Sequence, residues 1–262
     1  MEAILNTFNK PNEAPGDYLG EDGLLYCGKC CTAKQTRING KLRFCTCKCR
    51  QEEMRDAEER ETRKRIEEVR ERCLPVNGMH QHTFDEASDA KHIRLARRYV
   101  EKWGEMKARN TGLILWGSVG TGKSFTAHCI CNALIDKGVS VRLYSAAEIV
   151  NRLSDKDKRD ETIQKVRTVP LLVIDDVGAE RGTPFAREQL CRAIDERAES
   201  GLPLIVTTNY TIQEISNGTE PEMQRIFDRL QAMCIPIAVI GESRRRELGA
   251  QKLREARALL GL

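Results

Sequence analysis

The stretch "GSVGTGKS" (117–124) constrains the fold of this 262-residue chain more than any other segment. It matches the pattern G-x-x-x-x-G-K-[ST] in full. It follows the apolar run "TGLILW" (111–116) and precedes the helical sequence "SFTAHCICNALIDKG". A strand, a glycine-rich turn and a helix in this order place backbone amides around phosphate oxygens at the positive end of the helix. The sequence therefore predicts a phosphate-binding loop inside an α/β domain.

The residue types of this loop fit the phosphates of a nucleoside triphosphate. Its glycines allow the backbone to approach the ligand closely. The Lys123 ammonium reaches the β- and γ-phosphates, and the Ser124 hydroxyl is a ligand for Mg²⁺. The residues expected to bind the nucleotide here are Gly117, Ser118, Val119, Gly120, Thr121, Gly122, Lys123, Ser124 and Phe125.

Apolar runs of strand length alternate with helical segments around the loop. The other four runs are "VSVRLYS" (139–145), "PLLVIDD" (170–176), "LPLIVTTN" (202–209) and "IPIAVIG" (235–241). Short apolar strands separated by helices predict a parallel sheet with helices on both faces. The fold class is therefore α/β.

Polar side chains at the ends of these strands predict the rest of a phosphoryl-transfer site. Asp175 ends a buried strand, where it can bind Mg²⁺, and Asp176 beside it can polarise an attacking water. Asn209 ends a later strand and can orient water or contact the γ-phosphate. In "RIFDRL", Arg225 and Arg229 are four residues apart on one helical face, which fits either a solvated surface or a finger offered to a neighbouring subunit's nucleotide.

Six of the eleven cysteines lie between positions 27 and 49, in "CGKCCTAKQTRINGKLRFCTCKC". The chain has no apolar run near the roughly 18 residues of a membrane span, and its start is a poor signal peptide, so we expect a cytoplasmic protein. In a reducing compartment clustered thiols are more often metal ligands than disulfides. A structural zinc site is the favoured interpretation, ahead of free thiols, disulfides or an iron–sulfur cluster.

The chain divides into three predicted regions. Residues 1–50 form a polar lead-in and the cysteine module, 51–78 a charged helical linker, and 79–262 the α/β body. In the linker, acidic residues precede basic ones by four positions, which supports a solvated helix. The formal net charge of +4 is too small to identify a nucleic-acid binder.

The order of these motifs resembles that of the AAA+ ATPases, and among them the DnaC-type replicative helicase loaders. The resemblance covers residues 74–249. It implies a five-stranded sheet of order 5-1-4-3-2, with Asn209 as the sensor of the γ-phosphate. It also implies that Arg229 acts in trans on a neighbouring subunit, with Arg225 beside it at the same boundary.

Three further assignments depend on this resemblance. Phe84, in "TFDEA", would pack near the adenine, and Arg244 would be a second nucleotide sensor, although Arg245 and Arg246 are equally available. Zinc-bearing loaders carry a similar module that ends in C-x-C before a charged helix. That similarity favours the zinc ligands Cys27, Cys30, Cys47 and Cys49 over sets that use Cys31 or Cys45.

One departure concerns the carboxylate pair. Most AAA+ proteins carry Asp-Glu at the end of this strand, whereas this chain has Asp175 and Asp176. The second carboxylate is one methylene shorter, so we expect slow hydrolysis, which suits a switch in which ATP sets the assembly state.

The resemblance implies an ATP-dependent loader that uses ATP, Mg²⁺ and Zn²⁺. It would bind a hexameric replicative helicase through the zinc module, deliver it onto single-stranded DNA and self-associate as a hexamer or spiral. The helical segment 146–166 would contact the DNA, but acidic residues are interleaved with its cations and it has no row of aromatic residues. These cations are Arg152, Lys156, Lys158, Arg159 and Lys165.

Two other functions remain open. An IstB-type transposition helper has a very similar body, but the cysteine module argues against it because such helpers carry a helical DNA-binding head. A zinc-headed adaptor that binds ATP with little turnover is the third possibility. A small-molecule kinase is disfavoured because it would leave Asn209 and the arginine pair without a purpose.

Overall fold

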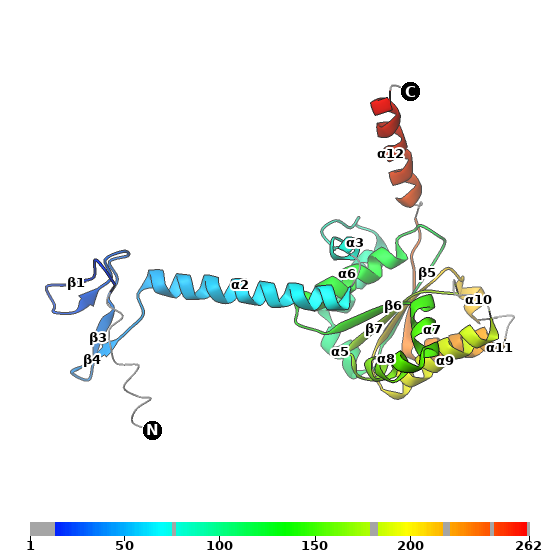
Figure 1. Cartoon of the computed structure of the whole chain (residues 1–262), viewed down its shortest axis with the longest axis horizontal. Coiled ribbons are helices and arrows are strands. Elements are labelled where there is room, and N and C mark those ends of the chain that lie inside the picture. The colour runs from blue at the N-terminus through cyan, green and yellow to red at the C-terminus, as the bar shows by residue number, and fades with distance from the viewer. Residues whose placement is uncertain (1–13, 75–76, 179–182, 217–220, 242–243, 261–262) are drawn as a thin grey trace. The chain divides into compact units, whose positions relative to one another are not determined.

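The computed structural model describes residues 14–74, 77–178, 183–216, 221–241 and 244–260 (Figure 1). The chain separates into two compact units, Met1–Arg65 and Ile66–Leu262. The boundary lies inside helix α2 (Lys48–Cys73). Within the described ranges, none of the helices has the length and apolar character needed to span a membrane.

The smaller unit contains short strands and little apolar core. Strands β1 (Tyr18–Leu19) and β2 (Leu25–Tyr26) pair antiparallel, as do β3 (Gln35–Ile38) and β4 (Lys41–Phe44). Asn39 and Gly40 join β3 to β4, and both have positive φ angles of 50° and 75°, which suits an Asn-Gly hairpin turn. Among the described residues of this unit, the buried apolar side chains are Leu25, Cys27 and Cys47. A core of this size cannot hold the unit folded.

Helix α2 is almost entirely polar, and none of the side chains of this fully described helix is buried. Toward its end, Ile66, Val69 and Cys73 are partly buried against the apolar core of the larger unit. Leu74, directly after the helix, is completely buried there. The last turns of α2 therefore pack as part of the larger unit.

The described part of the larger unit is built on a five-stranded parallel sheet of order β6-β7-β8-β5-β9. Its strands are β5 (Gly112–Trp116), β6 (Val141–Ser145), β7 (Leu171–Val177), β8 (Leu204–Thr208) and β9 (Cys234–Ala238). Numbered along the chain and counted from the β9 edge, this order is 5-1-4-3-2, as the family resemblance implies. In detail, the pairing of β7 with β8 is irregular, because its register shifts between Ile174 and Val177.

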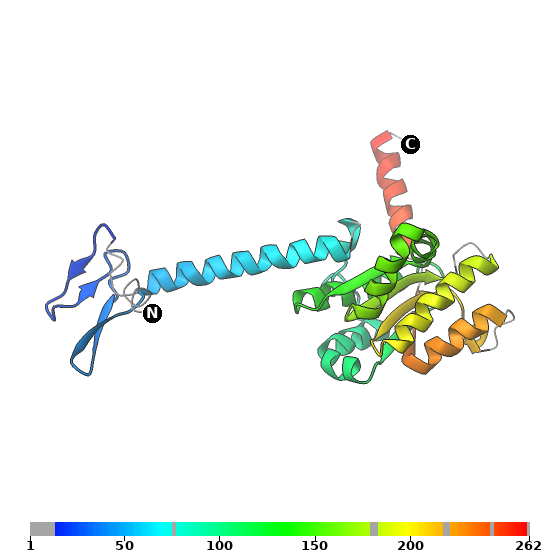
Figure 2. The same cartoon turned by 60° about the horizontal axis from the view of Figure 1, so that its bottom comes forward.

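Helices cover both faces of this sheet (Figure 1). Besides the end of α2, the helices of the described part of this unit are α3 (Asn77–His80), α4 (Lys91–Glu101), α5 (Trp103–Ala108), α6 (Lys123–Asp136), α7 (Ala146–Ser154), α8 (Lys156–Thr168), α9 (Pro184–Glu199), α10 (Ile212–Ser216), α11 (Pro221–Met233) and α12 (Arg244–Leu260). Successive strand residues enter opposite cores: Leu113 packs with α4 and α6, and Ile114 packs with α7, α9 and α11. This alternation explains why the strands read as continuous apolar runs. Figure 2 shows α9 and α11 side by side on one face.

A fully buried arginine connects α9 to the end of α8 and to the residues before β7 and β8. Arg197, in α9, has no exposed surface. Its Nε and Nη2 atoms donate to the Pro203 carbonyl at 3.2 and 2.6 Å, and Nη2 also donates to Pro170 at 3.1 Å. Its Nη1 atom donates to the carbonyls of Val166 and Val169, both at 2.8 Å. Burial lowers the pKa of Arg197 to about 10, so it remains charged at neutral pH. No local sequence pattern predicts this role for Arg197.

Candidate functional site

The phosphate loop has the backbone that its glycines predict. Gly117, Gly120 and Gly122 have φ angles of 152°, 87° and 104°, and Gly122 caps the start of α6. A Cβ atom at Gly117 would lie 2.4 Å from the carbonyl oxygen of Val239, next to the end of β9. Only glycine fits there, since such a contact is shorter than any van der Waals approach.

The Lys123 side chain is held across the mouth of this loop. It is 6% exposed, and its Nζ atom donates to the carbonyls of Gly117 and Ser118 at 2.9 and 2.8 Å. Nζ also donates to Oδ1 of Asn209 at 2.7 Å. Two polar residues predicted for the site from positions 86 residues apart are therefore in direct contact.

Asp175 and Asp176 are connected to each other by Thr207, a residue that the sequence did not single out. The Thr207 hydroxyl donates to Oδ1 of Asp175 at 2.6 Å and accepts from the backbone amide of Asp176 at 2.8 Å. Nδ2 of Asn209 donates to Oδ1 of Asp176 at 3.3 Å. Asp176 has a φ angle of 64°, within the irregular part of β7. The only sequence signal for Thr207 is a hydroxyl at the end of an otherwise apolar strand.

These contacts place acceptor oxygens and a cation at the same edge of the sheet. Carboxylate and hydroxyl oxygens suit Mg²⁺, and an ammonium suits phosphate. Asp175 with Ser124 would hold the metal ion, and Lys123 would hold the phosphates. The site therefore fits a magnesium–nucleotide complex.

The two phenylalanines predicted near the nucleotide differ in their surroundings. Phe84 is 8% exposed, and the Arg97 guanidinium lies 5.0 Å from the centroid of its ring. Arg97 also donates to the Phe84 carbonyl. Phe125 is half-buried, and its ring centroid lies 5.0 Å from that of His82. Packing of Phe84 near the adenine and binding of the nucleotide by Phe125 both stay predictions.

Two histidines, His128 buried and His82 half-buried, form a stacked pair close to the start of α6. The Nδ1 atoms of His82 and His128 are 2.8 Å apart, and the two rings stack with centroids 5.0 Å apart. Burial lowers the pKa of His82, and burial lowers the pKa of His128 to about 4. Both rings are therefore neutral at pH 7, and one donates to the other.

This pair predicts a loss of stability in mild acid. The folded state disfavours protonation, since its histidine pKa values lie below the usual value of about 6.5. The contribution of the neutral histidine pair to the free energy of unfolding is fully present above about pH 6.5 and is lost as the pH falls toward 4. We expect the free energy of unfolding to fall by about 2 kcal/mol between pH 7.5 and 5 because of His128 alone. Urea titrations of the wild type and His128→Gln test this; equal pH slopes in the two proteins would contradict it.

The arginine pair of α11 contacts α9. Nη2 of Arg225 lies 3.4 Å from Asp195 Oδ2, and Nε of Arg229 lies 3.1 Å from Asp195 Oδ1. Both side chains are mostly exposed, at 66% and 54%. An exposed position suits a residue that acts on another subunit, and that role stays a prediction. Arg244 begins α12, and its side chain, like those of Arg245 and Arg246, lies outside the described residues.

Most cations of the predicted DNA-contacting segment have partners within α7 and α8. Arg152 donates to the Thr162 hydroxyl at 3.2 Å, and Arg159 donates to the Leu153 carbonyl at 2.8 Å. Lys158 pairs with Asp155, and Lys165 pairs with Glu161. DNA binding by this segment gains no support from these contacts and stays a prediction.

In the smaller unit, the four cysteines favoured as metal ligands come together. The Sγ atoms of Cys27, Cys30, Cys47 and Cys49 all lie within 4.8 Å of one another. Cys49 is 3.5 Å from Cys27 and 3.4 Å from Cys47. These separations are too long for disulfides and close to the about 3.8 Å between sulfurs around tetrahedral zinc. Cys31 and Cys45 are exposed, and Sγ of Cys45 contacts the Ala33 carbonyl instead.

The chemistry of this cluster suits a divalent cation. A hydrogen bond with the Thr32 hydroxyl lowers the pKa of Cys30 to about 5, whereas contacts with the Cys47 and Cys27 sulfurs raise the pKa of Cys49 to about 12. Four thiolates this close cannot all be ionised without a cation among them. Zinc binds thiolates, so the four residues fit a structural zinc site with no position left for a substrate.

Comparisons with known proteins agree with this geometry. The replicative helicase loader DnaI of Bacillus subtilis (strain 168) is 29% identical over 182 residues, which cover 62% of this chain and 58% of that protein. The replicative helicase loader DnaC of Escherichia coli (strain K12) is 30% identical over 141 residues, which cover 52% of this chain and 55% of that protein. The chain thus spans a little over half the length of these relatives.

A solved structure and a family profile extend the comparison. The crystal structure of the DnaC helicase loader aligns with a TM-score of 0.56 at 22% identity, over 63% of this chain and all of that chain. This alignment supports the AAA+ fold. The profile of the family described as IstB-like ATP binding protein matches residues 49–252, most of the chain. The chain therefore belongs to the family of IstB-like ATP-binding proteins, with the AAA+ domain that it shares with the DnaC and DnaI helicase loaders.

Proposed function

We propose that this protein is an ATP-dependent loader that binds a replicative helicase and delivers it onto single-stranded DNA. The observation that carries the proposal is one chain with both an ATP site and a four-cysteine module. In that site Lys123, Asn209 and Asp176 are in contact. Loaders are among the relatives of the chain, which makes this function the best supported.

In this proposal each region has its own task. Residues 1–50 bind zinc and dock on the hexameric helicase. Residues 51–78 form a helical linker between this module and residues 79–262, which bind and hydrolyse ATP. The protein acts in the cytoplasm and self-associates as a hexamer or spiral when ATP is bound.

The chain's own residues divide the work of hydrolysis. Lys123 binds the β- and γ-phosphates, and Asp176 orients the attacking water, with Asn209 contacting both residues. Mg²⁺ neutralises phosphate charge when bound, and Thr207 keeps Asp175 aligned to hold it. Arg229 of one subunit approaches the γ-phosphate on the next and stabilises the charge that develops there.

The test is a loading assay with the replicative helicase of the same organism and a circular single-stranded DNA. We expect ATP and this protein together to increase helicase bound on the circle, and omission of either to abolish the increase. A helicase that neither binds this protein nor gains access to the circle would refute the loader function.

Lys123→Ala is expected to weaken ATP binding by about 100-fold, since charge-assisted hydrogen bonds to phosphate contribute up to about 3 kcal/mol. The measurement is isothermal titration with ATP and Mg²⁺. Lys107→Ala, an exposed lysine on α5, is the matched control and should bind as the wild type does. Retained affinity in Lys123→Ala would count against the site.

Arg229→Ala is expected to spare ATP binding but slow hydrolysis in the assembled protein by about 10³-fold, the lower range for an arginine finger. Phosphate release and sedimentation with ATP measure the two effects. Arg192→Ala, an exposed arginine of α9, serves as the control. If Arg229→Ala hydrolyses ATP and assembles normally, Arg229 is not a finger.

Membership of the IstB-like family supports a second candidate, a transposition helper ATPase. Such a helper would bind duplex DNA and a transposase rather than a helicase. Pull-down with each partner separates the two functions. The phosphate-release assay separates both from an adaptor that binds ATP without turnover.

A further inference from the structure

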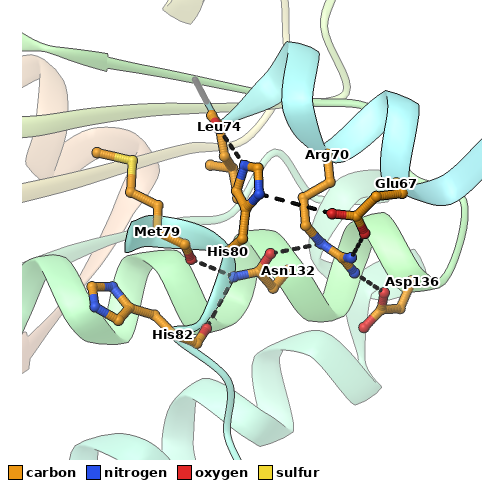
Figure 3. Close-up of polar contacts among 8 residues, drawn as sticks. All are labelled: Glu67, Arg70, Leu74, Met79, His80, His82, Asn132 and Asp136. Atoms are coloured by element: carbon orange, nitrogen blue, oxygen red, sulfur yellow. Dashed lines mark hydrogen bonds and ion pairs between the residues drawn. The ribbon is translucent and has the colours of Figure 1, made fainter. Parts of the chain in front are cut away.

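The last turns of α2 are fastened to the helix that follows the phosphate loop. Arg70 of α2 donates from Nε to Oδ1 of Asn132 on α6 at 3.1 Å, and from Nη2 to Asp136 one turn later on α6. Its Nη1 atom contacts Glu67 of its own helix. Figure 3 shows the guanidinium between these three acceptors. The Arg70 side chain is only 16% exposed, although its partners Glu67 and Asp136 are 48% and 58% exposed.

Asn132 fastens a second segment to the same point of α6. It is 2% exposed, and its Nδ2 atom donates to the carbonyls of Met79 and His82 at 2.9 and 3.0 Å (Figure 3). The ring of His80, in the same segment, contacts the Leu74 carbonyl at 2.6 Å. We call Arg70, Asn132 and Asp136 the Arg70 cluster. It joins the end of α2 and residues 79–82 to α6.

Residues 79–82 also contact the first turns of α6, through the side chain of His82. This side chain contacts His128, which lies one turn after Ser124, and packs on Phe125. Helix α6 thus carries Lys123 and Ser124 in its first turn, and it carries Asn132 and Asp136, two members of the Arg70 cluster, in its last two turns. An α-helix moves largely as a rigid element, so a change that steadies one end steadies the other.

We propose that ATP binding at the phosphate loop and the packing of residues 66–74 and 79–82 on α6 stabilise each other through the Arg70 cluster. The cluster acts by positioning α6 and does not touch the nucleotide. This inference rests on the proposed nucleotide site. It gives the charged helix a regulatory role, because the folded length of α2 then depends on whether ATP is bound.

Energetic coupling of this kind is reciprocal. If ATP protects residues 66–74 from local opening by a given factor, then the state in which this segment is open must bind ATP more weakly by the same factor. Coupling between protein sites is typically about 5- to 150-fold, so an effect of about fivefold or more is expected.

Hydrogen exchange of the full-length protein, with and without ATP and Mg²⁺, tests the proposal. We expect nucleotide to slow exchange of amides 66–74 by about fivefold or more in the wild type. In Arg70→Gln and in Asp136→Asn this slowing should shrink, and ATP affinity should fall by a factor whose upper limit is the coupling factor. Arg63→Gln removes an exposed arginine of the same helix and should leave both quantities unchanged.

Two outcomes overturn the inference and are distinct from failure of the nucleotide site. If ATP protects amides 117–126 but leaves 66–74 unaffected, the site stands and the coupling is wrong. If Arg70→Gln weakens the packing of 66–74 without changing ATP affinity, the cluster is merely structural. No protection at 117–126 would instead refute the nucleotide site itself.

Discussion

Removal of zinc is expected to unfold residues 14–47 and leave the ATP-binding unit intact. The smaller unit has few buried apolar side chains, so the metal must supply most of its folding free energy. Structural zinc contributes about 10–16 kcal/mol in small zinc-finger peptides, far more than such a core provides. Hydrogen exchange before and after a zinc chelator measures the effect, and the amides of β5 to β9 provide the internal reference.

Matched serine variants identify the ligands. Cys47→Ser removes a buried member of the four-cysteine cluster, and Cys45→Ser removes an exposed cysteine two residues away. We expect one zinc per chain in the wild type and in Cys45→Ser, and loss of zinc and of protection at residues 25–47 in Cys47→Ser. Equal zinc content in both variants would contradict the assignment, as would a smaller unit that stays folded without metal.

Arg197→Met is expected to lower the free energy of unfolding of the larger unit by about 3–5 kcal/mol. Four carbonyls lose a hydrogen-bond donor, and each buried acceptor that is left unsatisfied costs about 1–3 kcal/mol. Release of the buried guanidinium offsets part of this loss, because charge is costly to bury. The carbonyls belong to Val166, Val169, Pro170 and Pro203, so the damage centres on the start of β7 and the approach to β8.

The measurement is urea unfolding with the midpoint and slope fitted separately. Arg192→Met changes an exposed arginine of the same helix and is expected to stay within about 0.5 kcal/mol of the wild type. Arg197→Lys keeps a charge but offers fewer donors, so its stability should lie between the wild type and Arg197→Met. If Arg197→Met and Arg192→Met unfold alike, the buried contacts contribute nothing.

Local sequence patterns predicted the elements of this fold well. Each of the five apolar runs overlaps a strand of the sheet, and the phosphate loop lies between β5 and α6 as expected. The glycine positions of the loop follow from backbone sterics within a few residues. Such features depend on neighbours along the chain, which is why one sequence suffices to find them.

The choice of the four metal-binding cysteines was predicted only in part from the sequence. Spacing alone left six candidates, and resemblance to zinc-bearing loaders favoured four of them. The structure brings those four sulfurs together and leaves Cys31 and Cys45 exposed. The geometry of the two hairpins decides this, since they determine which side chains converge.

The sequence by itself determined the α/β class, the phosphate loop and the carboxylates at the strand ends, because periodicity and glycine placement act locally. Only the tertiary structure decided the roles of Thr207, Arg197 and Arg70. Their partners lie 6 to 66 residues away, and a threonine in a strand or an arginine in a charged helix looks ordinary until the fold supplies its contacts. Arg70 lies in a helix that composition marks as solvated, yet its contacts on α6 hold that end of the helix against the body.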